Sequence, residues 1–363
     1  MSLDLTNKTN IYILCPANIH TGGPKCLHQL ADQLQNVLKK KVYMYYFPLF
    51  SEKYENPVHE NYSSYKIKFV EEIEDTKDNV LIIPEMNKTI EISKKYKNIQ
   101  KVLWWLSIDF FLLTKFNDSF PKYIRSIIKV PFNIIFMFNK FTSCLFGNLS
   151  LPKYLKFLYL RFPFINVLEF KDIKINLTHS LYQQNALKYK NIKSDLLSDF
   201  IDDEFFEIGE SLDLTKKENI ICYNPKKSSF FMKKIIESNS MFKFVPLANL
   251  SKSDVISKLS KSKIYIDFGF HPGKDKMPRE AVLFNNCIIT NKKGSAKNSF
   301  DIPIKEKYKF FESQKNLVFI KKKINDIFNN YQKELKNFEK YKLKIISEKK
   351  VFRKNLKNIF LKK

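Results

Sequence analysis

The sequence predicts an α/β protein with two parallel-sheet domains in tandem, followed by a helical tail. Three observations lead to this expectation. Short apolar runs alternate with amphipathic stretches in the first half of the chain, and the alternation begins again after an acidic stretch near residue 200. Residues 321–363 then place apolar side chains at helical spacing, with lysines between them. A chain of 363 residues with 44% hydrophobic residues can form two cores.

The first half contains five apolar runs with the length and composition of buried strands. These runs are "NIYILCP" (10–16), "KVYMYYFP" (41–48), "NVLIIPE" (79–85), "KVLWWLS" (101–107) and "IKINLTHS" (173–180). Between them, residues 24–39 and 87–97 carry helical spacing. This alternation predicts βαβ units and a mainly parallel sheet.

The second half repeats the pattern after "SDFIDDEFFEIGE" (198–210), which marks a domain boundary. The expected strands are 219–225, 242–247, 263–269 and 286–292, and the expected helices are 228–239, 252–261 and 278–285. Two Rossmann-like domains are therefore expected, over residues 1–200 and 201–320. The tail, 321–363, should form one or two long amphipathic helices.

Residues 110–165 interrupt the strand pattern of the first domain. Their apolar run 131–146 is too short for a transmembrane helix and is interrupted by Lys140. The mixture of aromatic and cationic residues is typical of an interfacial helix, which would suit an anionic membrane surface bearing a lipid-linked acceptor. An insertion packed on the first domain, or a dimer contact, is the alternative.

Composition restricts the compartment and the partners. The cysteines show neither disulfide-like nor zinc-like spacing, and residues 1–10 lack an apolar leader, so a cytoplasmic location is expected. The formal net charge is +26, but the lysines are scattered rather than gathered in an Arg-rich arm. We therefore expect no nucleic acid partner; a nucleotide diphosphate or a membrane surface is the expected anion.

Two adjacent glycines, Gly22 and Gly23, follow the first predicted strand and precede the first helix. A backbone without Cβ can turn sharply there and direct helix N–H groups at an anion. The spacing matches neither GxGxxG nor a Walker A loop, so a plain strand-to-helix turn is the alternative.

A second glycine-rich stretch lies at 267–296, "DFGFHPGKDKMPREAVLFNNCIITNKKGSA". Five of the seven glycines lie in these two stretches, each on the C-terminal side of a predicted strand, where open α/β folds bind ligands. The polar side chains here suit a diphosphate and a sugar; they are His271, Lys274, Arg279 and Glu280. The alternative is a capped helix with Pro278 in its first turn and a solvated Arg-Glu pair.

These motifs resemble a known family. "HTGGP" (20–24), "CYNPKKS" (222–228) and above all "HPGKDKMPREAVLFNNCIIT" (271–290) are similar to group-one, family-four-like glycosyltransferases. The resemblance spans most of 10–310 and implies the GT-B fold, in which two Rossmann-like domains face a cleft. Bacterial surface-polysaccharide transferases carry similar sequences, which implies a role in capsule, lipopolysaccharide or other glycan assembly.

The resemblance also implies a donor site. Gly22 and Gly23 would approach the donor phosphates, Lys226 and Lys227 would meet the diphosphate, and Glu280 would hold the nucleotide ribose. Gly273, Lys274 and Arg279 belong to the same motif. The family has an acidic residue eight positions before the carboxylate, where this chain has Pro272, so His271 or Lys274 is expected to take over that contact.

The expected chemistry requires no metal and no cofactor beyond the nucleotide-sugar donor. Departure of a nucleoside diphosphate develops negative charge, which fixed cations and oriented N–H groups stabilise. Glu85 and Asp109 each follow a strand, and either could deprotonate an acceptor hydroxyl or cap a helix. His20 and His179 present similar alternatives. Three features are expected to be structural: the Asp202-Asp203 pair in the linker, His28 within a helix, and His59 in a loop without companions.

The sequence therefore predicts a metal-independent glycosyltransferase that moves a sugar from a nucleotide-sugar donor to a glycan or lipid-linked acceptor. The competing interpretation is a basic protein without catalytic activity that docks on a membrane or on nucleic acid.

Overall fold

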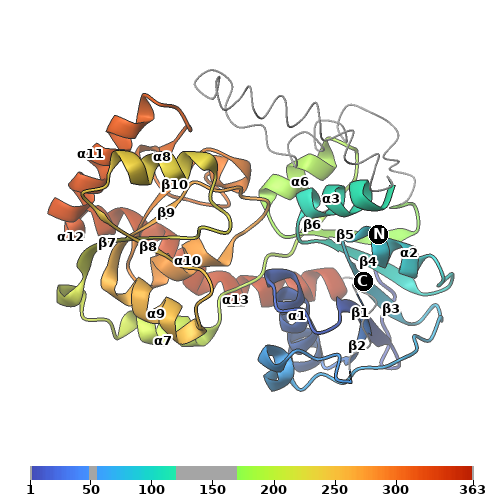
Figure 1. The fold of residues 1–363 in the computed structure, drawn as a ribbon. Helices are drawn as coiled ribbons and strands as arrows, with labels where there is room; N and C mark the ends of the chain where they lie inside the picture. The colour runs from blue at the N-terminus through green and yellow to red at the C-terminus, as the bar shows by residue number, and fades with distance from the viewer. Residues whose placement is uncertain (1, 49–54, 120–169, 362–363) are drawn as a thin grey trace. The chain divides into compact units, whose positions relative to one another are not determined.

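The computed structural model describes residues 2–48, 55–119 and 170–361 of the chain (Figure 1). Their Cα positions divide into two compact units between Asp199 and Phe200. The N-terminal unit contains the described residues up to 199 together with 350–361, and the C-terminal unit contains 200–349. Each unit is built around one parallel sheet.

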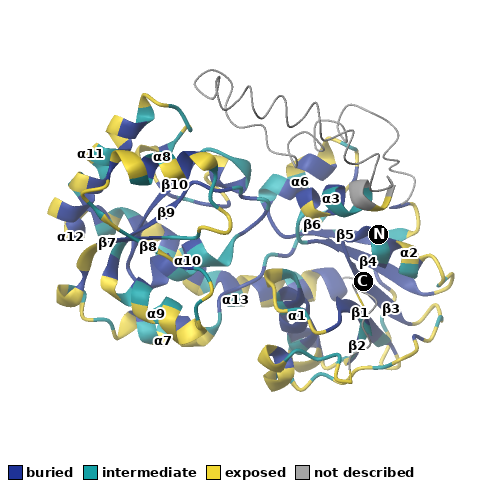
Figure 2. Ribbon diagram, in the orientation of Figure 1, coloured by how far each residue is buried: buried dark blue, intermediate teal, exposed yellow. Residues whose placement is uncertain are grey.

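The N-terminal sheet has the strand order β2-β1-β3-β4-β5-β6, and every pairing is parallel. Its strands are β1 (Asn10–Pro16), β2 (Lys41–Phe47), β3 (Val80–Pro84), β4 (Gln100–Trp105), β5 (Ile173–Thr178) and β6 (Asp195–Leu196). The five predicted strands are confirmed, and β6, with two residues, is additional. The central strands β3 and β4 are buried along their whole length, which is typical of parallel strands (Figure 2).

Helices and short 3-10 turns connect these strands. They are α1 (Gly22–Leu38), the 3-10 helix Glu60–Tyr65, α2 (Asn87–Ser93), α3 (Ile108–Ser119) and α6 (Leu181–Lys188). Helix α1 begins at Gly22, so the two glycines are its first residues rather than a loop before it. Helix α3 occupies the start of the expected insertion. The remainder of that insertion, 120–165, lies outside the described residues, and the interfacial helix stays a prediction.

The C-terminal sheet has the order β11-β10-β9-β7-β8, also parallel throughout. Its strands are β7 (Glu218–Tyr223), β8 (Lys243–Pro246), β9 (Ser262–Asp267), β10 (Cys287–Asn291) and β11 (Lys309–Phe310). The helices of this part are α7 (Asp203–Glu210), α8 (Phe230–Ser238), α9 (Lys252–Lys261) and α10 (Lys276–Leu283), with 3-10 helices at Leu214–Lys216, Gly294–Lys297 and Glu306–Tyr308. A reciprocal capping box between Ser251 and Asp254 starts α9.

The C-terminal segment is helical, as predicted. It consists of α11 (Asn316–Asn329), α12 (Tyr331–Leu335), the 3-10 helix Lys336–Phe338 and α13 (Glu339–Phe360). The apolar face of α11 joins the core of the C-terminal unit through Ile320, Ile324 and Ile327. Helix α13 starts in the C-terminal unit, whereas its last turns belong to the N-terminal unit.

The end of α13 is fixed within the N-terminal unit by side-chain hydrogen bonds. Arg353 Nε donates to Gln33 Oε1 of α1 at 2.7 Å, and Asn355 Nδ2 donates to the carbonyl of Leu196 at 3.2 Å. Phe352 and Leu356 are buried on the same stretch of the helix. The last turns of α13 are therefore an integral part of the N-terminal unit.

The two parallel sheets, with helices between successive strands, confirm the predicted pair of Rossmann-like domains. Among the described helices, none combines the length and the apolar character needed to span a bilayer.

Candidate functional site

The carboxyl ends of β7, β9 and β10 carry loops that pack against one another. A Cβ on Gly269 would lie 2.5 Å from the Lys227 carbonyl oxygen, and Gly269 forms an isolated bridge with Ser228. Gly294 has a φ of 52°, and a Cβ there would lie 1.9 Å from the His271 carbonyl oxygen. Both glycines are therefore required by the close approach of neighbouring loops.

A chain of buried charges runs through these loops. His271 is completely buried, with Nε2 at 3.7 Å from Asp267 Oδ1 and Nδ1 at 3.5 Å from Asp275 Oδ2. Asp275 also pairs with the Lys227 ammonium. Burial opposes charge on the His271 ring, but the two carboxylates outweigh it and raise its pKa. Burial likewise opposes ionisation of Asp275, yet Lys227 and His271 lower its pKa to about 2. The loops are thus held by an alternating series of charges.

Lys274 and Arg279 meet a carboxylate that the sequence analysis did not single out. Lys274 Nζ and Arg279 Nη1 each lie 2.7 Å from an oxygen of Glu348, on α13. Arg279 also donates from Nε and Nη2 to the carbonyls of Asp275 and Lys274. The alternative of a solvated Arg-Glu pair is therefore wrong, because the Arg279 side chain is fully buried and its carboxylate partner is Glu348. Phosphate binding by Lys274 and Arg279 stays a prediction.

The remaining predicted donor residues lie on the same loops or on α10. Lys226 is exposed in the loop after β7, where its backbone N–H donates to Asn224 Oδ1 at 3.0 Å. Gly273 is buried, and its carbonyl accepts from the Ser295 hydroxyl. Glu280 is half-buried at the start of the second turn of α10. The structure thus groups the basic pair with the His271 loop at one sheet edge.

A buried carboxylate, Glu312, joins two of these segments at this edge. Its oxygens accept from Ser229 Oγ at 3.0 Å and Asn291 Nδ2 at 2.8 Å, and it pairs with the Lys293 ammonium. Because these partners lie after β7 and at the end of β10, Glu312 fixes the same loops from the side of β11. Sequence reasoning missed this residue, since it lies in no recognisable motif.

In the N-terminal unit, Gly22 and Gly23 are the first residues of α1, and a Cβ at either position would lie in open space or at ordinary contact distance. A Cβ on Gly22 would have no neighbour within 4 Å, and one on Gly23 would meet only Leu106 Cδ1 at 3.9 Å. Among the described residues, Gly294 is the glycine with positive φ, so the angles at Gly22 and Gly23 do not require glycine. The open space is what a ligand contact would need.

Glu85 lies buried directly after β3 and binds the turn that leads into α3. Its Oε2 accepts the Leu106 N–H at 2.9 Å and its Oε1 accepts the Ser107 N–H at 2.7 Å. Burial raises the Glu85 pKa to about 7, although these hydrogen bonds favour the charged form. Glu85 thus accepts backbone N–H groups just before α3, as expected if it caps that helix. Its pKa of about 7 would suit proton transfer near neutral pH.

Asp109 lies in the first turn of α3, where its Oδ2 accepts from the Tyr182 hydroxyl at 3.2 Å. Burial and the nearby Asp109 carboxylate raise the pKa of Tyr182. Asp109 is itself buried, so in this conformation its carboxylate faces protein groups.

Two histidines of the first domain that were expected to be structural, His28 and His59, have different surroundings. His28 is buried between the Pro24 carbonyl and the Tyr46 hydroxyl, and burial lowers its pKa to about 4, which confirms a structural residue. His59 caps the 3-10 helix by accepting the Asn61 N–H. The expectation that His59 lacks companions is wrong, because its ring stacks on His20 with centroids 5.1 Å apart.

The Asp202-Asp203 pair lies at the start of α7. Asp203 is the first residue of the helix and pairs with the Lys349 ammonium. This contact occupies an acidic side chain that spacing alone could have suggested as a metal ligand.

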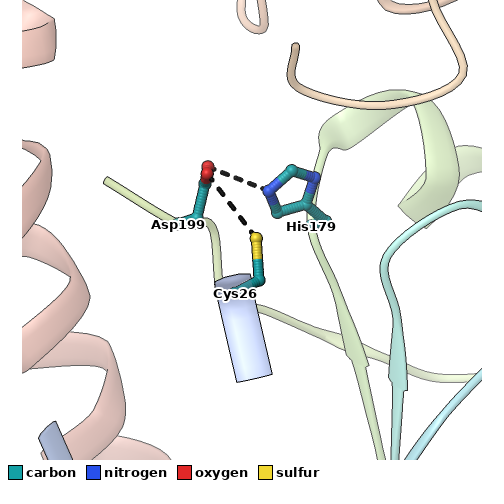
Figure 3. A group of neighbouring side chains, drawn as sticks. All are labelled: Cys26, His179 and Asp199. Atoms are coloured by element: carbon teal, nitrogen blue, oxygen red, sulfur yellow. Dashed lines mark hydrogen bonds and ion pairs between the residues drawn. The ribbon is translucent and has the colours of Figure 1, made fainter. Parts of the chain in front are cut away.

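One further polar cluster was not predicted as a group. Figure 3 shows Cys26, His179 and Asp199 converging: His179 Nε2 lies 2.9 Å from Asp199 Oδ1, and Cys26 Sγ lies 3.7 Å from Asp199 Oδ2. The three residues are far apart in sequence, so spacing gave no signal. The available signal was positional, because His179 and Asp199 follow strands β5 and β6, which are neighbours in the sheet.

Comparison with known proteins supports the fold. No protein-family model and no curated protein matches the sequence. Among solved structures, HepE from Anabaena in complex with UDP-glucose has 9% identity and a TM-score of 0.56, covering 96% of this chain and 99% of its own. Sucrose-phosphate synthase from Thermosynechococcus elongatus has 8% identity and a TM-score of 0.54, covering 97% of this chain and 95% of its own. The chain therefore has the two-domain GT-B fold.

Proposed function

We propose that this protein is a glycosyltransferase that takes a sugar from a nucleotide-sugar donor and requires no metal at the donor phosphates. The fold is shared over nearly the whole of both chains with HepE, whose structures hold UDP-glucose or UDP and glucose. The observation that carries the proposal is the sheet edge where Lys226 and Lys227 lie beside the His271 loop. Ligands of open α/β folds bind at this kind of edge.

The donor diphosphate binds to the loop after β7 in this proposal. Lys226 is exposed there, and Lys227 is held by Asp275, so the pair offers one solvent-exposed and one fixed cation. As the sugar leaves, charge grows on the diphosphate, and fixed positive groups stabilise that charge without having to reorganise. Glu280 accepts hydrogen bonds from the nucleotide ribose.

The buried residues of the second motif act by holding this loop in place. The His271 ring lies between Asp267 and Asp275, whose carboxylates raise its pKa, and Asp275 in turn fixes Lys227. Lys274 and Arg279 anchor the following segment to Glu348. Because its ring is completely buried, His271 acts in this proposal as a positioning residue rather than as a group in contact with the reacting atoms.

The acceptor binds to the N-terminal unit in this proposal, and the open space at Gly22 and Gly23 admits a substrate phosphate. Glu85, with a pKa of about 7, and Asp109 are the candidate bases for an acceptor hydroxyl. The acceptor is a glycan or a lipid-linked sugar of a surface polysaccharide, such as capsule or lipopolysaccharide. A cytoplasmic enzyme peripheral to the inner face of the membrane would meet both substrates.

A thermal-shift panel of UDP, GDP, CMP and ADP with their sugar derivatives tests the donor. We expect one nucleotide family to raise the melting temperature, because a ligand that binds only the folded state stabilises it. Isothermal titration of that nucleotide with Lys226→Ala and Glu280→Ala should show losses of about 1–3 kcal/mol each, the usual effect of leaving a polar group unpartnered.

The matched control is Lys216→Ala, which removes an exposed lysine before the amino end of β7, at the opposite edge of the same sheet. Its affinity should equal that of the wild type. Absence of any nucleotide binding, combined with salt-sensitive binding to anionic vesicles or to nucleic acid, would instead support the docking protein without catalytic activity.

A further inference from the structure

The Cys26, His179 and Asp199 side chains come from three different parts of the N-terminal unit. Cys26 lies early in α1, His179 directly follows β5, and Asp199 follows β6. One ligand atom from each lies within 4.8 Å of the others, and the side chains are directed at a common point (Figure 3). Their exposed fractions are 3%, 6% and 1%. Convergence of these three residue types in the interior calls for a chemical explanation beyond the proposed transfer reaction.

The donor set is one that zinc prefers. Thiolate, imidazole and carboxylate are the protein ligands of Zn²⁺, whereas calcium and magnesium take oxygen ligands almost exclusively. A thiolate and a carboxylate together carry two negative charges, which a divalent ion balances while the imidazole stays neutral. A loaded site would therefore bury no net charge, and uncompensated charge is what a protein interior tolerates least.

The distances fit a metal ion after small side-chain shifts. Bonds of about 2.3 Å to sulfur and about 2.0–2.2 Å to nitrogen and oxygen place the ligand atoms of a tetrahedral site roughly 3.3–3.6 Å apart. The His179 Nε2 to Asp199 Oδ1 separation of 2.9 Å and the Cys26 Sγ to Asp199 Oδ2 separation of 3.7 Å lie on either side of that range, and one ligand atom from each residue lies within 4.8 Å of the others. We expect rotations of the three side chains to close the difference.

The backbone around two of the ligands is held by its own hydrogen bonds. The His179 N–H donates to the Trp105 carbonyl at 3.1 Å and to Gln183 Oε1 at 3.0 Å, and the His179 carbonyl accepts from Ser198 Oγ at 2.6 Å. The Leu197 N–H donates to the Thr178 carbonyl at 2.8 Å. The loops after β5 and β6 are therefore fixed before any metal arrives, as an effective site requires.

We propose that Cys26, His179 and Asp199 bind one Zn²⁺ ion, with water in the fourth position. The ion joins the start of α1 to the loops after β5 and β6, and it stiffens the helix end at which Gly22 and Gly23 lie. This site is independent of nucleotide binding by the C-terminal unit.

The test uses the full-length protein, freed of metal with a chelator and then titrated with ZnCl₂ by calorimetry. We expect one zinc per chain and a higher melting temperature on binding. Substituting residues that only hydrogen-bond to the metal ligands typically lowers metal affinity about 10- to 100-fold. Cys26→Ser removes a ligand itself and should lower the zinc affinity by at least that much. Cobalt in place of zinc should give thiolate-to-metal charge-transfer absorption that Cys26→Ser abolishes.

Two variants serve as controls. Cys15→Ser removes another buried thiol of the same unit, and its zinc affinity should match the wild type. His59→Ala removes the stacked surface pair with His20 and should also leave binding unchanged. The proposal is overturned if the wild type binds no zinc, or if tight binding survives in a folded Cys26→Ser variant. Because nucleotide binding is measured separately, failure of this site would leave the proposed transferase function intact.

Discussion

A Cβ on residue 269 would lie 2.5 Å from the carbonyl oxygen of Lys227, so the loops after β9 and β7 pass each other at backbone distance. In Gly269→Ala the neighbouring backbone must move, because a carbonyl oxygen cannot rotate away as a flexible side chain can. We expect the free energy of unfolding to fall by about 1–3 kcal/mol, as in overpacked cores, with weaker nucleotide binding at the displaced Lys227. Urea denaturation and nucleotide titration measure the two effects.

Gly22→Ala is the matched control, because a Cβ there has open space within 4 Å. Its stability should be equal to the wild type or higher by up to about 1 kcal/mol, since alanine restricts the unfolded chain. If Gly22→Ala and Gly269→Ala lowered the free energy of unfolding equally, the close contact with Lys227 would not be the cause of the loss.

Gly23→Ala separates a ligand contact from a plain turn. The new Cβ would meet only Leu106 Cδ1, at the ordinary contact distance of 3.9 Å, so the melting temperature should stay close to that of the wild type. In our proposal the same Cβ occupies space needed by a substrate phosphate, and turnover should drop markedly. A transferase assay of the variant with the matched donor and acceptor distinguishes the two alternatives. Full activity would show that the glycine pair serves only the strand-to-helix turn.

Arg279→Met tests whether the buried arginine is structural. The substitution removes the Arg279–Glu348 ion pair and leaves the Lys274–Glu348 pair in place. Breaking a buried ion pair typically lowers stability by about 3–5 kcal/mol. The double variant Arg279→Met, Glu348→Gln should lose less than the sum of the two single changes, because the buried charge disappears with its partner. Chemical denaturation measures both. Wild-type stability with loss of nucleotide binding alone would assign Arg279 to the donor instead.

Glu85→Gln tests the raised pKa. The folded protein holds the Glu85 proton up to about pH 7, whereas an unfolded glutamate releases it near 4.5. Between these values the folded state binds more protons, so this group lowers the stability as pH rises, by about 3 kcal/mol over the whole interval. Glutamine cannot titrate, so the stability difference between variant and wild type should shift in favour of the variant from pH 5 to pH 8. Parallel denaturation profiles would contradict the assignment.

The strands could be predicted because parallel strands bury both faces and leave continuous apolar runs such as 79–85 and 101–107. The two-residue strands β6 and β11 have no such signal, since their pairing depends on neighbouring strands rather than on their own composition. The start of α1 differed from the expected residue 24 because glycine, although a poor helix former in a helix interior, is tolerated in the first turn, where the N–H groups have no intrahelical partner.

The candidate site could be predicted only in part, because sequence shows which residues follow a strand but not whether their side chains are already paired. The sequence places His271 and Arg279 in one motif, but it does not show that their carboxylate partners include Asp267 and Glu348, and Glu348 lies in the final helix. Cys26 and Asp199 meet through tertiary structure alone. No spacing rule connects a residue early in α1 with one that follows β6.

The discontinuous N-terminal unit constrains the order in which the chain can fold during synthesis. Its sheet is complete once β6 has left the ribosome, but the α13 turns that bind Gln33 and Leu196 are made only after the whole C-terminal unit. The N-terminal unit therefore stays incomplete, with apolar surface uncovered, while the C-terminal unit is translated. A fragment ending near residue 200 would retain that unfinished surface and should be prone to aggregation, whereas adding residues 350–361 in trans as a peptide should relieve it.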